Sequence, residues 1–488
     1  MTQSTLAFST HEEIDQCTAD LAATFRSGLT RPLAFRKQQL RQLLRMLDEN
    51  EDALTEALRL DLNKHYVEAM TTEITLVRDE TARAIDKLSS WAASDYPSTR
   101  FTFMLSRPHV RKEPQGMVLV MGAWNYPITL LLSPVVAAIA AGNTVPSEVS
   151  SHTAQAITKL LPVYMDQRAY RVVNGAADEC TYMLNKRFDH IFYTGNGVVG
   201  RIIMQAAAKH LTPVTLELGG KSPVIIHRSC NLKVAAQRIF YGKFLNCGQT
   251  CIAPDYVLCP SDLLPGLVDA LRGCYQHAYD GDGVSSTSYG RIINHRHFDR
   301  LHGLLKESKA KGEQVLMGGN ADRDTKYIEP TVVACTVDSP LMRDEIFGPL
   351  LPIIAMDTVD EAVDFVNSRD QPLALYLFAT DKKVIKHILD STRSGGACVN
   401  DTVLQFAIGQ IPFGGTGHSG IGRYHGKYGF DTFSHMRATL HSGYADEPLR
   451  KSFIYPPYNI KKMPVLAFAL SKYTLAGRRA NSKPSGTN

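Results

Sequence analysis

The sequence predicts an α/β protein in which two α/β domains enclose a cleft. Short apolar runs typical of buried strands alternate with helical stretches: Met117–Met121 precedes an apolar helix from Ile128, and His190–Thr194 precedes a helix at Val199–His210. Such alternation is typical of parallel sheets with crossover helices. A second α/β set follows Cys251, and a chain of 488 residues is long enough for about two or three domains.

The remaining elements follow from their local patterns. From about Glu12 to Trp91 the spacing of apolar residues is helical, and we expect this segment to serve packing alone. The later predicted elements are a strand at Val224–Ile226, a helix at Leu232–Leu245, strands at Tyr256–Cys259 and Pro352–Ala355, a helix at Val359–Asn367 and a strand at Leu375–Ala379. The glycine-rich stretch Gly409–Gly422 contains interleaved apolar residues, so we expect a folded loop.

The composition excludes several classes of protein. Lys and Arg number 53 against 48 Asp and Glu, and the resulting net charge of +5 is too dilute for a nucleic-acid-binding surface. Hydrophobic residues make up 44% of the chain and charged residues 21%, so extensive disorder and coiled coil are disfavoured. We therefore expect a globular protein without a nucleic-acid partner.

The cysteines and the N-terminus predict a cytoplasmic protein. The nine cysteines are odd in number and lack short regular spacing, which argues against a disulfide framework; without a CxxC pair we expect no metal site. The N-terminus carries Glu12, Glu13 and Asp15 and lacks the charged-then-apolar pattern of a signal peptide. The apolar stretch Ile128–Ala141 is shorter than the ~20 residues that a membrane span needs.

The segment Asn246–Pro254, NCGQTCIAP, holds the candidate nucleophile. Cys251 ends a small polar turn that follows a predicted helix and precedes a predicted strand, a setting that leaves a thiol reachable from a cleft. Cys247 in the same segment is the alternative. For either cysteine the competing interpretation is a small buried hydrophobic residue.

Glu217 is the candidate proton acceptor, since it lies between leucines and beside a Gly-Gly turn. A carboxylate buried there would have a raised pKa suited to proton transfer, unless it reaches solvent.

The GxGxxG string of Gly195, Gly197 and Gly200 follows a strand and opens a helix, a context for binding a pyrophosphate. Glu217 also stands where such a motif places a ribose-binding acid, so spacing leaves both roles open. A Walker A loop is rejected, because Thr215 stands where that motif needs glycine.

Two further segments carry candidate residues. Asn125 follows a buried strand in GAWNYP, where its amide could stabilise a developing oxyanion or simply form a turn. Glu345 and Phe347 lie beside a rigid turn in EIFGP. There the ring could stack on a planar cofactor and the carboxylate could bind a ribose, although this segment alone is typical of a loop.

Together these strings resemble the aldehyde dehydrogenase superfamily over most of the chain. The resemblance is carried by EPQG at Glu113, GAWNYP at Gly122, FYTGN at Phe192, LELGGKSP at Leu216, NCGQTCIAP at Asn246, EIFGP at Glu345 and PFGGTGHSGIGRYHG at Pro412. The strings YGRIINHRHFDRL, HGKYGFDTFSH and YPPY are similar to the class 3 branch, which includes fatty aldehyde dehydrogenases.

The resemblance implies an aldehyde dehydrogenase-like fold with three parts. Residues 1–216 would form N-terminal helices and a Rossmann-type dinucleotide-binding domain, residues 217–420 a catalytic thiol domain, and residues 421–488 a small β oligomerisation segment with a C-terminal tail. The implied activity is the NAD- or NADP-dependent oxidation of a medium-chain, long-chain or otherwise apolar aldehyde to the carboxylic acid. A homodimer is implied as well.

The resemblance also implies the site roles. Cys251 would form the thiohemiacetal and thioester, Asn125 and the Cys251 backbone N–H would bind the oxyanion, and Glu217 would activate water as general base. The implied cofactor-binding residues are Trp124, Gly195, Gly197, Gly200, Glu345 and Phe347.

One segment departs from the family pattern. Val145 runs straight into Pro146, Ser147 and Glu148, without the lysine that in the family anchors the adenosine ribose or the extra phosphate of NADP. We expect a shortened strand that affects the cofactor edge, and the choice between NAD and NADP stays open. The alternative hypothesis is therefore a cofactor-impaired relative that acts as a cysteine esterase or a non-catalytic binding protein. An acylating dehydrogenase is less favoured, because Glu217 is present.

The tail has an apolar run from Met463 that ends before Lys472. We expect a lid over the aldehyde site, with a peripheral membrane contact as the alternative. The expected localisation is thus cytoplasmic with a membrane-associated alternative.

Overall fold

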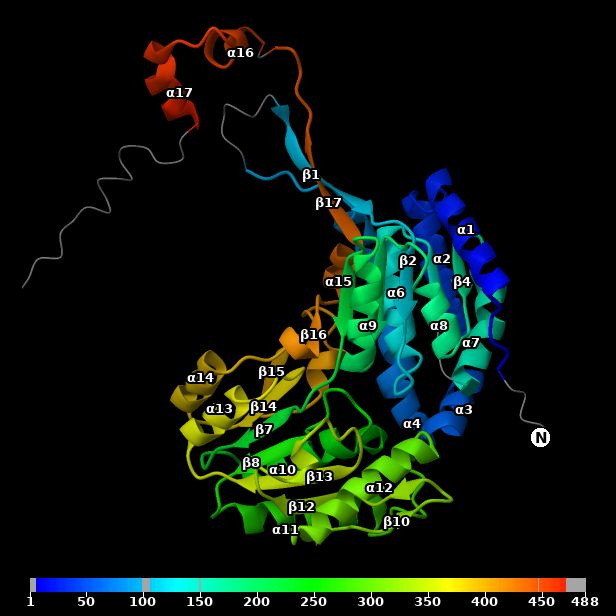
Figure 1. The fold of residues 1–488 in the computed structure, drawn as a ribbon, viewed down its shortest axis with the longest axis vertical. Helices are drawn as coiled ribbons and strands as arrows, with labels where there is room; N and C mark the ends of the chain where they lie inside the picture. Colours follow the sequence, from blue (N-terminus) through cyan, green and yellow to red (C-terminus); the bar gives the residue numbers. More distant parts are fainter. Residues whose placement is uncertain (1–5, 99–105, 149–150, 446, 471–488) are drawn as a thin grey trace, which may run out of the picture. The chain divides into compact units, whose positions relative to one another are not determined.

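The structure, a computed structural model, describes residues 6–98, 106–148, 151–445 and 447–470. The chain divides into two compact units, one of residues 1–91 and 114–434 and one of residues 92–113 and 435–488. The first unit contains two sheets of mainly parallel strands with helices beside them, which confirms the predicted α/β class (Figure 1). The functional division expected at 216/217 and 420/421 stays a prediction.

The first sheet has six strands in the order β16-β6-β5-β2-β3-β4. Its strands are β2 (Val118–Met121), β3 (Val145–Glu148), β4 (Tyr170–Val172), β5 (His190–Thr194), β6 (Val214–Glu217) and β16 (Gly420–Ile421). All neighbouring strands are parallel except β16, which runs antiparallel to β6. The crossover helices are α6 (Thr129–Ala141), α7 (Ser151–Tyr164), α8 (Ala177–Met183) and α9 (Gly197–Ala208). The strand predicted at His190–Thr194 is confirmed at both ends.

The short segment before Pro146 still completes this sheet. Val145 to Ser147 pair in parallel with β4, and Ser147 and Glu148 pair with β2. Strand β3 is therefore paired on both sides, and the edge expected to bind the cofactor keeps its strand order. The expected disturbance of that edge is not found in the strand pairing.

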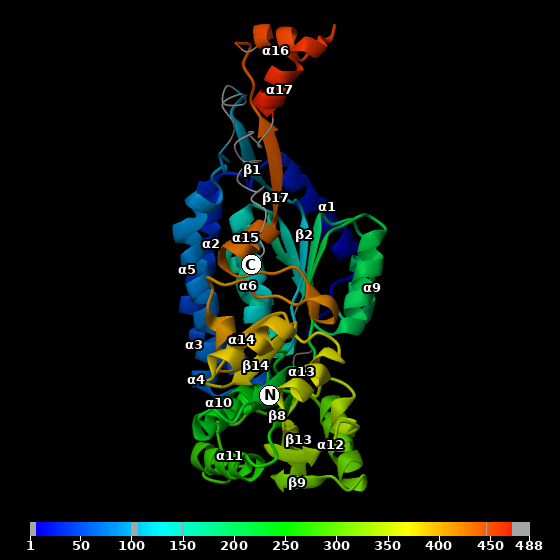
Figure 2. The same ribbon diagram turned by 90° about the vertical axis from the view of Figure 1, so that its left-hand side faces the viewer.

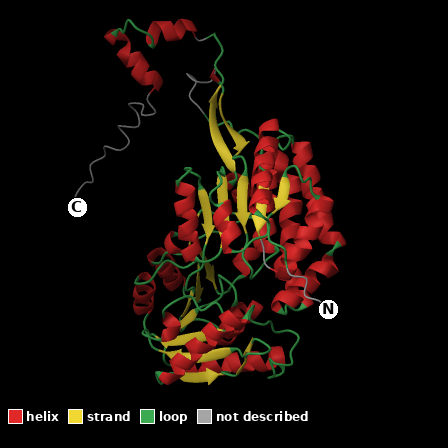
Figure 3. Ribbon diagram, turned by 45° about the vertical axis from the view of Figure 1, so that its right-hand side comes forward, coloured by secondary structure: helices red, strands yellow, loops and turns green. Residues whose placement is uncertain are grey.

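The second sheet has seven strands in the order β15-β14-β7-β8-β13-β12-β9, and only the pair of β9 with β12 is antiparallel. Its strands are β7 (Pro223–Ile226), β8 (Tyr256–Cys259), β9 (Gln314–Met317), β12 (Thr331–Cys335), β13 (Leu350–Ala355), β14 (Ala374–Phe378) and β15 (Gly396–Val399). Its helices are α10 (Leu232–Phe244), α11 (Leu264–Tyr279), α12 (His295–Ala310), α13 (Val359–Asn367) and α14 (Lys382–Ser391). Figure 3 shows the strands of both sheets accompanied by helices. The strand at Tyr256–Cys259 and the helix at Val359–Asn367 match the predicted bounds.

Helices precede the first sheet in the chain. They are α1 (His11–Ser27), α2 (Leu33–Glu49), α3 (Glu51–Leu62), α4 (Tyr66–Ala69), the π-helix η1 (Met70–Ile74) and α5 (Thr75–Trp91). Helix α5 packs on α2 and on the fully buried α6, so the apolar stretch from Ile128 is a buried helix as predicted (Figure 2). The predicted glycine-rich loop is folded and contains the turn Gly417–Ser419 and β16. It is followed by α15 (Gly426–Thr432).

The second unit contains a two-stranded sheet of β1 (Pro108–Pro114) and β17 (Ser434–Leu440), followed by α16 (Glu447–Phe453) and α17 (Met463–Leu470). Arg437 of β17 pairs with Glu113 of β1. The first part of the apolar tail forms helix α17, and the rest of the tail lies outside the described residues. Within the described ranges, no helix is both long enough and apolar enough to cross a bilayer.

Candidate active site

Cys251 lies in a tightly folded loop between α10 and β8. The loop begins with a 3₁₀ turn at Leu245–Gly248, in which Asn246 and Cys247 adopt left-handed φ values of 50° and 55°. Such conformations are strained for residues other than glycine and need support from their surroundings. The Asn246 side chain provides part of it, because its Nδ2 donates to the backbone oxygens of Asn125 (2.8 Å) and Gln249 (3.1 Å).

The two cysteines of this loop differ in what they face. Cys247 is fully buried, and its Sγ donates to the Tyr289 hydroxyl at 3.3 Å. Cys251 instead lines a cavity of about 200 Å³, which we call the catalytic chamber. Burial raises the pKa of the Cys251 thiol to about 12, and the charges of Glu345 and Glu217 act in the same direction. The backbone N–H groups of Cys251 and Ile252 favour the thiolate.

The catalytic chamber is mostly apolar. Its apolar and aromatic walls include Leu76, Tyr126, Leu130, Leu245, Ile252 and Phe406. The polar groups at Cys251 include the hydroxyls of Tyr126 and Thr250, which lie 2.7 Å apart and satisfy each other. A chamber of this kind favours an apolar ligand with one reactive polar end.

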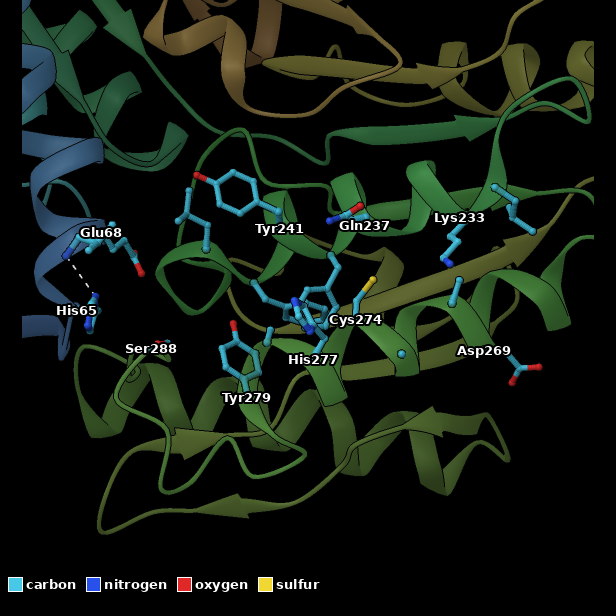
Figure 4. A pocket seen from close by; sticks show the side chains of 18 of the residues that line it. His65, Glu68, Lys233, Gln237, Tyr241, Asp269, Cys274, His277, Tyr279 and Ser288 are labelled. Carbon is cyan, nitrogen blue, oxygen red and sulfur yellow. Dashed lines mark hydrogen bonds between the residues drawn. The ribbon is translucent and has the colours of Figure 1, made fainter.

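A second cavity of about 1260 Å³, which we call the outer cavity, lies among α10, α11 and the α4 segment. Figure 4 shows side chains of these three elements around it, including Tyr241, Cys274 and Glu68. Thr71, Tyr241 and Leu245 line both cavities, so the two are neighbours. The outer cavity is lined by none of the site residues predicted from the sequence.

Asn125 lies in the turn between β2 and α6 and is 3% exposed. Its Nδ2 donates to the Gln249 backbone oxygen at 3.1 Å, in the loop that leads to Cys251. Together with the bond from Asn246 to the Asn125 backbone oxygen, this contact joins the turn to the thiol loop. The structure thus brings the predicted oxyanion donor and the predicted nucleophile to one place.

Glu217 ends β6, and its carboxylate is buried. Neither carboxylate oxygen has a hydrogen-bond partner among the described residues. Burial therefore raises the pKa of Glu217 well above its ordinary value. Because its charge raises the pKa of the Cys251 thiol, the carboxylate lies within electrostatic reach of that thiol.

The predicted phosphate turn lies beside the end of β6. The Gly195 N–H donates to the Glu217 backbone oxygen at 3.0 Å, and Asn196 caps α9 by accepting from the Val199 N–H at 3.0 Å. Helix α9 begins at Gly197. A Cβ atom at Gly195 would lie 2.1 Å from the Tyr193 hydroxyl, and one at Gly200 would lie 2.9 Å from Leu218 Cδ2, so neither position has room for a side chain.

The remaining predicted cofactor-binding residues are Trp124, Glu345 and Phe347. The Trp124 and Phe347 rings meet edge to face with centroids 5.4 Å apart. A Cβ atom at Gly219 would lie 2.1 Å from Glu345 Oε2, so the glycine lets this carboxylate lie close to the backbone after Glu217. Burial raises the pKa of Glu345 to about 8, and the charge of Asp255 adds to the shift.

Sequence reasoning missed a buried charged group from the N-terminal helices. Lys64 and Glu73 pair at 2.5 Å with both side chains fully buried, and Glu68 Oε1 accepts from the Asn246 N–H at 2.9 Å. The segment expected to serve packing alone therefore also makes a polar contact with the loop that carries Cys251. A hint was available, because charged residues seldom lie on the buried face of an amphipathic helix unless they are paired.

Comparison with known proteins places this geometry in context. A family model described as "Aldehyde dehydrogenase family" matches residues 2–439. The chain is 46% identical to "Aldehyde dehydrogenase family 3 member A2" of Mus musculus over 94% of each chain. It is 46% identical to "Aldehyde dehydrogenase, dimeric NADP-preferring" of Rattus norvegicus, over 90% of this chain and 96% of the relative. The solved structure "Substrate bound state of Staphylococcus Aureus AldH" matches with a TM-score of 0.88 and 38% identity, over 93% of this chain and 99% of that chain.

Proposed function

Because the chain belongs to the aldehyde dehydrogenase family, it is an oxidoreductase that acts on the aldehyde group with NAD or NADP, and we propose that its substrate is an apolar aldehyde of medium or long chain. The observation that carries the substrate proposal is the apolar catalytic chamber, which Cys251 lines. Each methylene group removed from water contributes about 0.8 kcal/mol, so a chamber with these walls favours longer alkyl chains.

In the proposed reaction, Cys251 Sγ adds to the aldehyde carbon and forms a thiohemiacetal. The negative charge that develops on oxygen is stabilised by the Asn125 amide and the Cys251 backbone N–H. The thiol gives up its proton to water as the sulfur adds, so Glu217 takes no part in this step. After hydride leaves the carbon, the acyl group remains on Cys251 as a thioester.

Glu217 is proposed to activate the water that hydrolyses the thioester. A buried carboxylate with a raised pKa is a stronger base than an exposed one. Both carboxylate oxygens are unpartnered among the described side chains and backbone groups, so they are available to a water molecule. Glu217 takes a proton from this water and passes it to the leaving Cys251 sulfur, so that the carboxylic acid is released, the thiol is restored and Glu217 is a carboxylate again.

The residues present fit a dinucleotide. The N-terminus of α9 offers backbone N–H groups next to a turn in which Gly195 and Gly200 leave no side chain in the way of a phosphate. Val198 and Ile202 are large apolar residues exposed on the first turns of the same helix, suited to a planar base. Glu345 and Phe347 are proposed to contact the nicotinamide ribose and ring, with Trp124 supporting Phe347. When bound, NAD or NADP supplies the hydride acceptor.

The family lysine before Pro146 is absent, so the segment Val145–Glu148 does not select between NAD and NADP. This absence also supports the second candidate, a cofactor-impaired cysteine esterase. Turnover of an aldehyde series with each cofactor, followed by NAD(P)H absorbance, tests the first function. Ester hydrolysis that is lost in Cys251→Ala, without any aldehyde turnover on either cofactor, would establish the second.

We propose a homodimer, a cytoplasmic localisation and a lid role for the tail. The dimer rests on the rat relative, whose name describes it as dimeric. Sedimentation at several protein concentrations tests it.

Deletion of the residues after Pro464 is expected to change KM for long aldehydes. Unchanged kinetics with binding to anionic vesicles would favour a peripheral membrane contact instead.

A further inference from the structure

We propose that Lys64 and Glu73 are positioning residues that hold Asn125 in place for the oxyanion. The inference rests on the proposed role of Asn125. Lys64 Nζ donates to Glu73 Oε1 at 2.5 Å and to the Asn125 backbone oxygen at 3.1 Å. The same ammonium lies over the Tyr126 ring, 3.9 Å from its centroid. One buried cation thus contacts two consecutive residues, Asn125 and Tyr126, of the turn between β2 and α6.

Glu73 holds the other end of this turn. Its Oε2 accepts from the backbone N–H groups of Ile128 (2.9 Å) and Thr129 (3.1 Å), at the start of α6. The Thr129 hydroxyl donates in return to the Thr72 and Glu73 backbone oxygens, each at 3.1 Å. A carboxylate at a helix N-terminus is favourable because it satisfies N–H groups and opposes the helix dipole. Lys64 and Glu73 therefore form hydrogen bonds with the turn on both sides of Pro127.

The same segment also reaches the thiol loop. Glu68 Oε1 accepts from the Asn246 N–H at 2.9 Å, and Asn246 is one of the two left-handed residues of that loop. Lys64 and Asn246 Nδ2 both donate to the Asn125 backbone oxygen. The turn and the loop are thus fixed to one short stretch of chain that includes the π-helix η1. Single π turns of this kind are frequent at functional sites.

Burial explains why this group is more than a local stabiliser. Lys64 and Glu73 are completely shielded from solvent, and an ion pair in such a place contributes little net stability compared with apolar packing. It does fix geometry, because each charge must keep its partners. Catalysis by an oxyanion donor is sensitive to geometry, and a displacement of about 1 Å can cost roughly a hundredfold in rate.

A double-mutant cycle tests the proposal. Glu73→Gln keeps the shape of the side chain but removes its charge, and kcat is expected to fall about tenfold with less change in KM. In the Asn125→Ala background the same change should alter kcat less than about twofold, because the group it positions is gone. A purely structural role would instead give the same fold-change in both backgrounds.

Controls separate the ways in which this test can fail. Arg78→Met breaks another ion-pair cluster, with Asp48 and Glu51, and should lower the thermal midpoint while kcat stays within about twofold. If Glu73→Gln does not fold, Thr129→Val removes the return bond and takes its place in the cycle. If Asn125→Ala leaves kcat unchanged, the proposed function of Asn125 fails. If Asn125→Ala lowers kcat but the Glu73 effect persists in that background, the positioning proposal is overturned.

Discussion

Asn125 and Glu217, the two candidate residues beside Cys251, differ in how their polar atoms are satisfied. The Asn125 backbone oxygen accepts two hydrogen bonds and its side-chain amide donates to a backbone oxygen. By contrast, both Glu217 carboxylate oxygens are buried without a partner in the described part of the chain. The buried hydroxyls of Thr194 and Tyr424 also have no hydrogen-bond partner among the described residues. Thr194 is paired with Glu217 in the register of β5 and β6.

This difference matches two chemical tasks. A donor that stabilises developing charge works best when it is fixed in advance, because no reorganisation is then needed during the reaction. A general base must instead accept a proton from a mobile water, so partners from the protein would compete with that water. The structure thus pairs a rigid residue for binding charge with an unsatisfied residue for moving protons.

The largest effect is expected from Glu217, the unsatisfied residue. Glu217→Gln should lower steady-state kcat by roughly 10²- to 10⁴-fold, because the general base for hydrolysis is lost. The first turnover of NAD(P)H should remain as a burst, since thioester formation precedes the water step. Stopped-flow absorbance measures both phases. If the burst amplitude disappeared while steady turnover stayed normal, the assignment of Glu217 to hydrolysis would be wrong.

Asn125, the rigid residue, should respond differently. Asn125→Ala is expected to lower kcat by roughly 10²- to 10³-fold, the usual cost of losing one oxyanion donor. Here the first turnover should slow as well, because the donor acts when the thiol adds to the aldehyde. The ratio of burst rate to steady rate distinguishes the two variants. If Asn125→Ala and Glu217→Gln gave the same ratio, the assignment of Asn125 to acylation and of Glu217 to hydrolysis would be wrong.

The chamber walls should affect substrate choice more than chemistry. Ala407 lines the catalytic chamber, and Ala407→Leu would occupy space there. We expect KM for a long alkyl aldehyde to rise about tenfold, the loss of roughly two buried methylene groups. KM for a short aldehyde should change less than about twofold. A uniform rise for all chain lengths would contradict the chamber as the site of the alkyl chain.

Stability should report the raised pKa of Glu217 through its pH dependence. The folded state holds the proton more tightly than the unfolded state, where the pKa of Glu is about 4.3. The Glu217 contribution is therefore fully present below that pH and is lost as pH rises toward the folded-state pKa. Relative to Glu217→Gln, the wild-type thermal midpoint should fall across this range. A constant difference between the two proteins would show that the folded-state pKa is not raised.

The smallest effect is expected at the second cysteine of the loop. Cys247→Ser should keep kcat within about threefold, because Cys247 faces Tyr289 and is absent from the chamber lining. The serine hydroxyl can donate to the same phenol. Loss of activity comparable to that of Cys251→Ser would reverse the assignment of the two thiols.

Local patterns predicted several of the strands and helices that carry the site, but not β6, which carries Glu217. Strands β5 and β8 and helix α13 match their predicted bounds because their apolar runs are short and bounded by turn residues. The choice between Cys247 and Cys251 could not be made from spacing, since it depends on which thiol faces a cavity. That is set by the left-handed residues before Cys251, a property of the tertiary fold.

The buried charges were missed for a related reason. Lys64 and Glu73 lie in a segment whose apolar spacing predicts packing, and the partners that they hold between β2 and α6 are more than fifty residues away in sequence. No local pattern encodes such a contact. The shortened segment before Pro146 keeps its strand pairing on both sides, and the expected effect on cofactor binding there stays a prediction.

One measurement tests the central claim most directly, that Cys251 carries the acyl group and Glu217 removes it. Glu217→Gln would be mixed with a long-chain aldehyde and cofactor, quenched in acid after the burst, digested and analysed by mass spectrometry. We predict close to one acyl group per active site, located on the peptide at Cys251. An acyl group on Cys247, or none at all during continued turnover, would contradict the account.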